Sequence, residues 1–275
     1  MAYIVTPRHQ NDARSLRRLI ETEDPLYYGL KKLKIRGRDL HELPRSVFNI
    51  LELEVLELSP DREACLDFKL VELPPSIGKL VNLKVLILDT NEMETLVPEV
   101  TLLVGLERLA LSNNHLSSLP AGFKNMTNLR SLHLSNNEFE VFPSELCELE
   151  NLEFLDMCDN LLDELPTQIC KMKGLHTLLL CFNRLQTLPD SLCKMTELRC
   201  LWLGNNKLKS LPKNFAQLKN VDWDWRYISS LLEGNPLIRP PIEVCRLGMA
   251  AIDRYLNGDR GNLTARASAR SDSSY

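Results

Sequence analysis

Residues 198–212 read LRCLWLGNNKLKSLP. Leu201 and Leu203 are separated by one residue, and a period of two is typical of a β-strand with one buried face. Because successive side chains of a strand point to opposite faces, Trp202 is expected to face away from the core that the two leucines enter. Asn206 follows, and its amide can both donate to and accept from the backbone groups of a turn. The stretch therefore predicts a strand and a turn, with the largest apolar side chain on the outside.

The same pattern recurs at a nearly constant interval along most of the chain. Counted from their first leucine, six of the seven spacings between units are 23 residues, and the unit from Leu53 is 30 residues long. The units begin at Leu30, Leu53, Leu83, Leu106, Leu129, Leu152, Leu175 and Leu198. Their ninth place holds asparagine at Asn91, Asn114, Asn137, Asn160, Asn183 and Asn206. Their fifteenth place holds proline at Pro44, Pro120, Pro143, Pro166, Pro189 and Pro212, and at Pro74 once the longer unit is allowed for.

These intervals predict the architecture. A proline disfavours helix at the residue before it, so about a dozen residues must return the chain to the next strand. A single unit cannot bury its own leucines, and successive units must stack to form a continuous core. The sequence therefore predicts a solenoid with a parallel sheet on one side.

In these repeats the chain resembles the leucine-rich repeat superfamily, and more narrowly the short 23-residue class of intracellular Ras-group proteins such as the Ras suppressor, scribble and densin. The resemblance covers residues 30–241. It implies an α/β solenoid that is curved, with strands on the concave face and short or irregular returns on the convex face. It also implies a non-catalytic scaffold or adaptor in signalling, whose partner is another protein, with a small GTPase-pathway component as one possibility.

Two stretches depart from the repeat. Residues 59–69 carry seven extra residues and put Phe68 at the asparagine place, so we expect a surface loop there. In the segment 220–236, Asn235 fits the ninth place, but counting back puts the unit start at Tyr227. The register between residues 219 and 232 therefore stays ambiguous, and the chain holds about nine repeats.

Both ends are predicted to cap the solenoid, because exposed solenoid ends need polar covers. Residues 1–29 are expected to form a helical cap, with Asp12 as N-cap and an apolar stripe of Leu16, Leu19 and Ile20. Residues 242–256 are expected to form one closing helix. Residues 257–275 have little apolar content and are typical of a disordered tail.

The third, fifth and seventh places of each unit are expected to point outward on the open side of the sheet. Equivalent places in neighbouring parallel strands lie about 4.8 Å apart, so their side chains touch. This predicts an apolar patch of Phe154, Leu179 and Trp202, with Phe182 at its rim and with Cys158, Cys181 and Cys200 beside it. Asp156, His133 and Arg108 are expected to add polar specificity toward the N-terminal side.

This patch is interpreted as a partner-binding site, because exposed apolar patches mark interaction surfaces and Trp is enriched in binding hot spots. Two alternatives remain open: the segment 219–232 folds back over the patch, or the patch is merely tolerated. The role itself also has alternatives, namely a substrate-recruiting subunit of a kinase, phosphatase or ubiquitin ligase, and a structural cytoskeletal or junctional component.

The first strand is expected to be basic, with Lys32, Lys34 and Arg36 outward. This pattern is consistent with a binding site for an acidic or phosphorylated partner, but lysines on an outermost strand also discourage edge pairing. Lys34 has a lateral neighbour of opposite charge in Glu57.

Charge, hydropathy and cysteine content narrow the remaining functional classes. The net charge is −4 and the pI about 5.8, which argues against a general attraction to nucleic acid or anionic membrane. No apolar run has the length of a signal peptide or a membrane span, so we expect a cytoplasmic, monomeric protein with reduced cysteines. Cys158 and Cys181 alone are too few ligands for a structural zinc site. His133, Asp156 and Cys158 share an open face without a water-excluding pocket, so we expect no catalysis, metal or cofactor.

Overall fold

The computed structural model describes residues 13–36, 40, 43–60, 69–223 and 231–258. The chain divides into two compact units, residues 1–133 (unit 1) and 134–275 (unit 2), and each is described by itself. The loop expected at 59–69, the residues 224–230 and the tail from 259 therefore lie wholly or mostly outside the described residues, as do Asp12, Phe68 and Tyr227.

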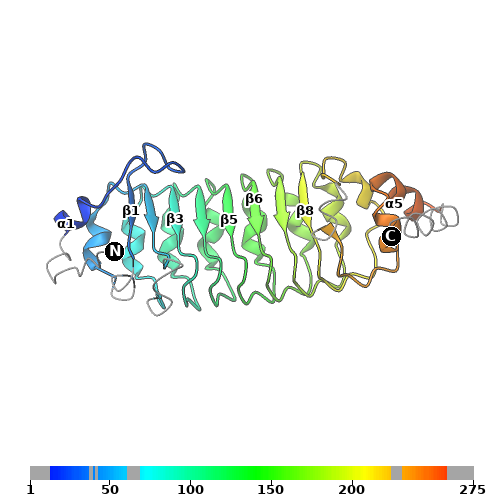
Figure 1. The fold of residues 1–275 in the computed structure, drawn as a ribbon, viewed down its shortest axis with the longest axis horizontal. Helices are drawn as coiled ribbons and strands as arrows, with labels where there is room; N and C mark the ends of the chain where they lie inside the picture. The colour runs from blue at the N-terminus through cyan, green and yellow to red at the C-terminus, as the bar shows by residue number, and fades with distance from the viewer. Residues whose placement is uncertain (1–12, 37–39, 41–42, 61–68, 224–230, 259–275) are drawn as a thin grey trace, which may run out of the picture. The chain divides into compact units, whose positions relative to one another are not determined.

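Unit 1 contains a short helix and a parallel sheet (Figure 1). Its helix is α1 (Ala13–Arg17), and its strands are β1 (Lys32–Lys34), β2 (Val55–Glu57), β3 (Val85–Ile87), β4 (Arg108–Ala110) and β5 (Ser131–His133). Consecutive strands pair in parallel with equivalent places of the repeat side by side. The returns carry 3-10 turns at η1 (Arg45–Asn49), η2 (Pro75–Lys79), η3 (Pro98–Leu102) and η4 (Ala121–Asn125).

Unit 2 continues the same pattern of strand and return. Its strands are β6 (Phe154–Asp156), β7 (Thr177–Leu179) and β8 (Cys200–Trp202), again parallel and in register. Its 3-10 turns are η5 (Ser144–Glu148), η6 (Thr167–Lys171), η7 (Asp190–Lys194) and η8 (Phe215–Gln217), and two helices follow, α4 (Ile242–Cys245) and α5 (Met249–Leu256). Both units therefore confirm the predicted leucine-rich repeat architecture of a parallel sheet with short returns.

The prolines and leucines act as the sequence predicts. Pro166 precedes η6 with φ −69° and ψ 149°, an extended conformation that its ring favours and that ends the preceding segment. The central leucine of each strand in unit 2 is buried, as Leu155, Leu178 and Leu201 show. Burial of a leucine contributes roughly 2 kcal/mol, so the stacked leucines of successive repeats supply most of the stabilisation.

The ninth-place asparagines form a buried ladder that links each repeat to the one before it. The Nδ2 group of Asn183 donates to the carbonyl oxygens of Leu180 (3.2 Å) in its own repeat and Met157 (2.9 Å) in the preceding one. Its Oδ1 accepts from the backbone N–H of Leu162 at 3.0 Å. Asn235 makes the same contacts one repeat after Asn206, so a ninth repeat is present although its first residue lies outside the described ones.

The N-terminal region differs from the predicted helical cap over 1–29. The described helix ends at Arg17, and Leu19, expected in the apolar stripe, is 55% exposed. The chain then runs antiparallel to β1, where Glu21 and Lys32 exchange two backbone hydrogen bonds of 2.9 Å. Pro25 and Gly29, the latter at φ 82°, favour turns over helix in this stretch. The N-terminal segment therefore pairs with β1 directly.

The C-terminal region also differs from the single helix predicted over 242–256. It forms α4 and α5, which are separated at Gly248. Gly248 has φ 96°, a conformation that breaks a right-handed helix and that glycine adopts without a steric penalty. Val244 and Ile252 of the two helices are buried. Among the described residues, no helix has both the length and the hydropathy to cross a membrane.

Candidate interaction surface

The outward side chains of β6–β8 form a row that we call the unit 2 face. It consists of Phe154, Asp156, Thr177, Leu179, Cys200 and Trp202, and all six are partly exposed. They alternate with the buried central leucines of the strands, so Trp202 faces away from the core as the sequence predicts. The face therefore presents large, partly exposed apolar side chains on a parallel sheet.

The strand register fixes which of these residues are neighbours. Asp156 pairs with Leu179, and Leu179 pairs with Trp202. Phe154 pairs with Thr177, so it lies in the adjacent column and diagonal to Leu179. Phe154, Leu179 and Trp202 therefore share one face. Leu179 and Trp202 are register neighbours, and Phe154 lies in the adjacent column.

Phe182 stands out at the end of β7. It occupies the eighth place of its repeat and has φ 55°, in the left-handed region. The other eighth-place residues of unit 2 with this conformation are Asn136, Asp159 and Asn205. Asparagine and aspartate tolerate left-handed backbone through local hydrogen bonding, whereas a bulky aromatic residue there is a genuine outlier. The Phe182 ring is nevertheless 54% exposed, so it contributes little to the core.

Two carboxylates accompany the apolar residues. Asp156 accepts the backbone N–H of Cys158 at Oδ1 (3.0 Å). Asp159 is exposed, and its pKa is raised by partial burial of the carboxyl group and by the negative charge of Asp156. The two groups therefore create a local negative field beside Leu179.

Cys158 and Cys181 are lateral neighbours whose thiols are hydrogen-bonded to one another. The backbone N–H of Cys181 also donates to the Cys158 Sγ at 3.2 Å. The hydrogen bond from the neighbouring thiol lowers the pKa of Cys181, whereas the same interaction and burial raise the pKa of Cys158. Within the described residues, no group of three or more His, Cys, Asp or Glu side chains is arranged to hold a metal ion.

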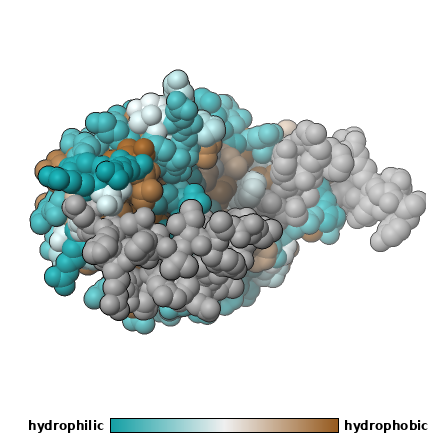
Figure 2. Space-filling model, turned by 60° about the vertical axis from the view of Figure 1, so that its left-hand side comes forward, coloured by the Kyte–Doolittle hydropathy of each residue, from teal (hydrophilic) through white to brown (hydrophobic). Residues whose placement is uncertain are grey.

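The corresponding surface of unit 1, the unit 1 face, has a different character. It consists of the outward residues Lys32, Lys34, Val55, Glu57, Val85, Ile87, Arg108, Ala110, Ser131 and His133. The sequence predicts an open row, but Val55 and Val85 are 0% and 6% exposed. They lie laterally between Lys32 and Arg108, whose long aliphatic stems flank shorter side chains. Figure 2 shows hydrophobic residues as small patches among hydrophilic ones on the coloured part of the side that it draws.

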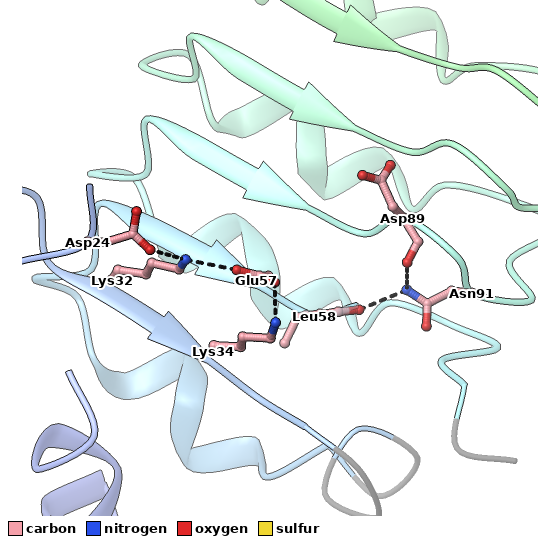
Figure 3. A network of polar contacts seen from close by, with 7 residues as sticks. All are labelled: Asp24, Lys32, Lys34, Glu57, Leu58, Asp89 and Asn91. Atoms are coloured by element: carbon pink, nitrogen blue, oxygen red, sulfur yellow. Dashed lines mark hydrogen bonds and ion pairs between the residues drawn. The ribbon is translucent and has the colours of Figure 1, made fainter. Parts of the chain in front are cut away.

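The lysines of β1 are held in an ion-pair network (Figure 3). The Lys32 Nζ lies 2.6 Å from Asp24 Oδ2 and 2.9 Å from Glu57 Oε2, and it sits 5.3 Å from the centre of the Tyr27 ring. Lys34 Nζ lies 2.7 Å from Glu57 Oε1, which confirms the lateral pair that the sequence indicates. Asp24 was not foreseen, because only the return of the N-terminal segment to β1 places it there. The predicted basic strand is thus largely neutralised within unit 1.

Burial and pairing act in opposite directions on these pKa values. Burial alone disfavours the charged forms of Glu57 and Lys32. At Glu57 the hydrogen bonds from Lys34 and Lys32 outweigh it, and at Lys32 those to Asp24 and Glu57 do so. The pKa of Glu57 is therefore lowered and that of Lys32 raised. For Asp24, the hydrogen bond from Lys32 is the main reason that its pKa is lowered.

Arg108 and His133, the predicted polar specificity residues, belong to the unit 1 face. The Arg108 Nε is buried without a hydrogen-bond partner among the described residues. The His133 Nε2 lies 3.0 Å from the Ser131 Oγ on the same strand. Phe154, Asp156, Leu179 and Trp202 thus lie on neighbouring strands of unit 2 and Phe182 follows β7, whereas Arg108 and His133 lie in unit 1.

The segment 219–232, whose folding back over the patch is one of the alternatives, is described at residues 219–223 and 231–232. The Trp223 indole N–H donates to the Cys245 carbonyl at 2.9 Å, and its ring packs edge-on against Phe215 with centroids 6.1 Å apart. Trp223 therefore belongs to the C-terminal end of unit 2. The rest of the possible cover, residues 224–230, lies outside the described residues.

Comparisons with known proteins agree with this architecture. The Leucine rich repeat family model matches residues 104–162 and 173–223, which include β4 to β8. Together with the repeated strands, turns and asparagines, the match supports a leucine-rich repeat protein. No curated protein sequence matches the chain.

Three solved structures are similar in fold. A leucine-rich repeat protein of Leptospira interrogans is 29% identical with a TM-score of 0.68, over 80% of this chain and 58% of that one. The ectodomain of the Arabidopsis thaliana receptor kinase GASSHO1/SCHENGEN3, in complex with Casparian strip integrity factor 2, is 25% identical with a TM-score of 0.60, over 74% and 26%. The plant peptide hormone receptor RGFR1, in complex with RGF2, is 23% identical with a TM-score of 0.55, over 74% and 34%, and shows the fold alone. The chain thus spans 58% or less of the length of each.

Proposed function

We propose that this protein is a non-catalytic adaptor that binds a partner protein through the unit 2 face. The observation that carries the proposal is the direct register of Leu179 with Trp202, both outward and partly exposed on a rigid sheet. Leaving two large apolar side chains in water forgoes the burial that stabilises the core, so a role outside folding is expected. Trp is also enriched among residues that dominate binding free energy.

Phe154 and Phe182 extend this surface, and Asp156 gives it polarity. Arg108 and His133 are proposed to contribute specificity from the unit 1 face. The receptor ectodomain of Arabidopsis thaliana is solved in complex with another protein factor, which supports binding as the use of this fold. An open sheet without an enclosing pocket suits recognition of a protein better than bond chemistry.

We propose that this adaptor acts in signalling inside the cell, as the resemblance to the Ras-group class implies. All the cysteines among the described residues are free thiols, including the hydrogen-bonded neighbours Cys158 and Cys181. Reduced neighbouring thiols are typical of a reducing compartment. A small GTPase-pathway partner and a monomeric state belong to the same proposal.

The test is a quantitative affinity purification with three matched baits. The first bait is the intact protein, and the second carries Phe154→Ser and Trp202→Ser. The third carries Val141→Ser and Ile238→Ser, which remove apolar side chains that are 75% and 70% exposed but lie outside the strands. Unfolding curves of all three establish that each bait is folded.

The proposal predicts partners that the intact and control baits retain and the face variant loses. For a purified partner, Trp202→Ala should weaken binding by about 2 kcal/mol, as at a hot spot. If all three folded baits retain the same partners with equal yield, the unit 2 face is not the binding site.

A further inference from the structure

We infer that the unit 2 face takes a partner segment that presents an apolar side chain with a lysine or arginine beside it. This inference rests on the proposed function and names the chemistry of its partner. Its support comes from the backbone at Phe182, from the placement of the carboxylates, and from the repeat register.

The residue type at Phe182 is not explained by the fold. Six non-glycine residues of the described chain hold positive φ at this place of the repeat, and the other five are Thr90, Asn113, Asn136, Asp159 and Asn205. Thr90 is β-branched, but the other four are Asn or Asp, which the left-handed region accepts far more readily than an aromatic residue. Because the ring is 54% exposed, the strained backbone is not compensated by core packing. Residues held in such conformations gather at functional sites, so Phe182 is assigned as a second apolar anchor, in the repeat before that of Trp202.

The carboxylates lie one repeat before Leu179 and Phe182, at the same places of the repeat. Asp156 is the register partner of Leu179. Asp159 occupies the same place in its repeat as Phe182 does in the next, and the two make equivalent backbone hydrogen bonds, to the carbonyls of Cys181 (2.9 Å) and Gly204 (3.0 Å). Neighbouring parallel strands are about 4.8 Å apart, so Leu179 and Phe182 each have an aspartate at the same place of the preceding repeat. Trp202 follows Leu179 one repeat further on.

These carboxylates have no cationic partner among the described residues. No lysine, arginine or histidine nitrogen there forms an ion pair with Asp156 or Asp159. The pKa of Asp159 is raised by partial burial of its carboxyl group and then by repulsion from the negative charge of Asp156. A cation from a partner relieves this repulsion, whereas an acidic peptide or a nucleic acid increases it. Charge complementarity therefore selects a basic and apolar protein segment.

The experiment selects peptides from a random display library on three forms of the intact protein: wild type, Asp156→Asn with Asp159→Asn, and Trp202→Ser. Asparagine is well tolerated at the eighth place, as Asn136 and Asn205 show, and it keeps an acceptor oxygen for the Cys158 N–H at residue 156. The aspartate variant thus removes charge with little change in shape. Unfolding curves establish that all three forms are folded.

Wild type is expected to enrich peptides in which Lys or Arg accompanies an aromatic or branched aliphatic residue. The aspartate variant should keep the apolar preference and lose the basic one. A synthetic peptide from the selection should bind the aspartate variant about 10-fold more weakly, and its Lys→Gln form should bind both proteins equally. Added salt should reduce the affinity for wild type more than for the variant.

The outcomes separate this inference from the proposed function. Peptides that need Trp202 but show no excess of Lys or Arg contradict the inference alone, as does an unchanged affinity for the aspartate variant. A selection in which no peptide depends on Trp202 contradicts both. If peptides with the basic preference bind the Trp202→Ser form as well as wild type, Trp202 is not the anchor that both proposals assume.

Phe182→Asn tests this anchor independently, because it is expected to raise stability and to lower peptide affinity. Asparagine relieves the left-handed backbone, so the unfolding midpoint should rise. Loss of the ring should weaken the selected peptide about 5-fold. A variant that gains stability and binds the peptide with unchanged affinity would show that Phe182 is not an anchor.

Discussion

The unit 1 face and the unit 2 face occupy the same places of the repeat, but their side chains differ in burial and in ion pairing. On the unit 1 face, Lys32 is 6% exposed and ion-paired to Asp24 and Glu57, and Val55 is fully buried. On the unit 2 face, Leu179 and Trp202 remain partly exposed, and Leu179 has Asp156 beside it. The lysines of the first surface are paired within unit 1, whereas the second surface keeps large apolar side chains partly exposed.

This difference shows which part of the repeat encodes the fold. The asparagine ladder is the same in both units, since Asn114 and Asn183 each bond their own sixth-place carbonyl and that of the preceding repeat. The outward places are not needed for this ladder, so they are available either for internal ion pairs or for recognition. The predictions below separate the shared scaffold from the two faces.

The largest effect is expected from the ladder. Asn183→Ala removes hydrogen bonds to the carbonyls of Leu180 and Met157 and leaves the buried N–H of Leu162 without its acceptor. Unsatisfied buried groups cost about 1–3 kcal/mol each, so the free energy of unfolding should fall by about 3 kcal/mol. Urea denaturation followed by circular dichroism measures this value.

Asn114→Ala in unit 1 serves as the matched control, because its amide makes the equivalent contacts. The two losses should agree within about 1 kcal/mol. If only one of the two variants lost unfolding free energy, the view that both units share one scaffold would be contradicted.

A smaller effect is expected from the unit 1 network. Glu57→Gln removes the carboxylate that both Lys32 and Lys34 contact, and Lys32 then keeps only Asp24. Breaking a buried pair costs about 3–5 kcal/mol, but these side chains retain some exposure and glutamine keeps hydrogen bonds, so we expect about 2 kcal/mol. A loss below about 0.5 kcal/mol would mean that the network does not stabilise unit 1.

The pH dependence of the same variant tests the network further. The pKa of Glu57 is lowered in the folded state, so its contribution is complete above its ordinary value of 4.5 and is lost as the pH falls through the folded value. The difference in unfolding free energy between wild type and Glu57→Gln should therefore shrink below about pH 4. The pKa of Lys32 is raised, so its contribution persists at neutral pH and declines only above about 10.5.

The smallest effect on stability is expected on the unit 2 face. Trp202→Ala truncates a partly exposed side chain whose backbone pairing with Leu179 is unchanged. The free energy of unfolding should fall by about 1 kcal/mol or less, well below the cost for a buried aromatic residue. A loss above about 3 kcal/mol would identify Trp202 as a core residue.

The sequence predicts the scaffold well because the scaffold is repetitive. The position of Asn183 at a fixed interval from Leu175 determines the turn, and Pro166 determines where the return begins. The outward direction of Trp202 follows from its place between two buried leucines. Each of these results needs only information within one repeat and its neighbour.

Features that depend on unique segments could not be predicted in this way. The pairing of Glu21 with Lys32, which places Asp24 beside the ammonium group, depends on how the N-terminal segment returns to β1. The burial of Val55 depends on side chains of neighbouring repeats.

The left-handed backbone of Phe182, by contrast, could have been predicted, because Asn or Asp recurs at its place in the other repeats of unit 2.

The most direct test measures two quantities on the same two variants, Glu57→Gln and Trp202→Ala. One quantity is the free energy of unfolding, and the other is the affinity for a peptide selected on the wild-type protein. Our account predicts that Glu57→Gln loses about 2 kcal/mol of stability and keeps its affinity, whereas Trp202→Ala loses about 2 kcal/mol of binding free energy with little loss of stability. If Trp202→Ala binds as wild type does, or if Glu57→Gln is the variant that loses the peptide, the assignment of recognition to the unit 2 face is wrong.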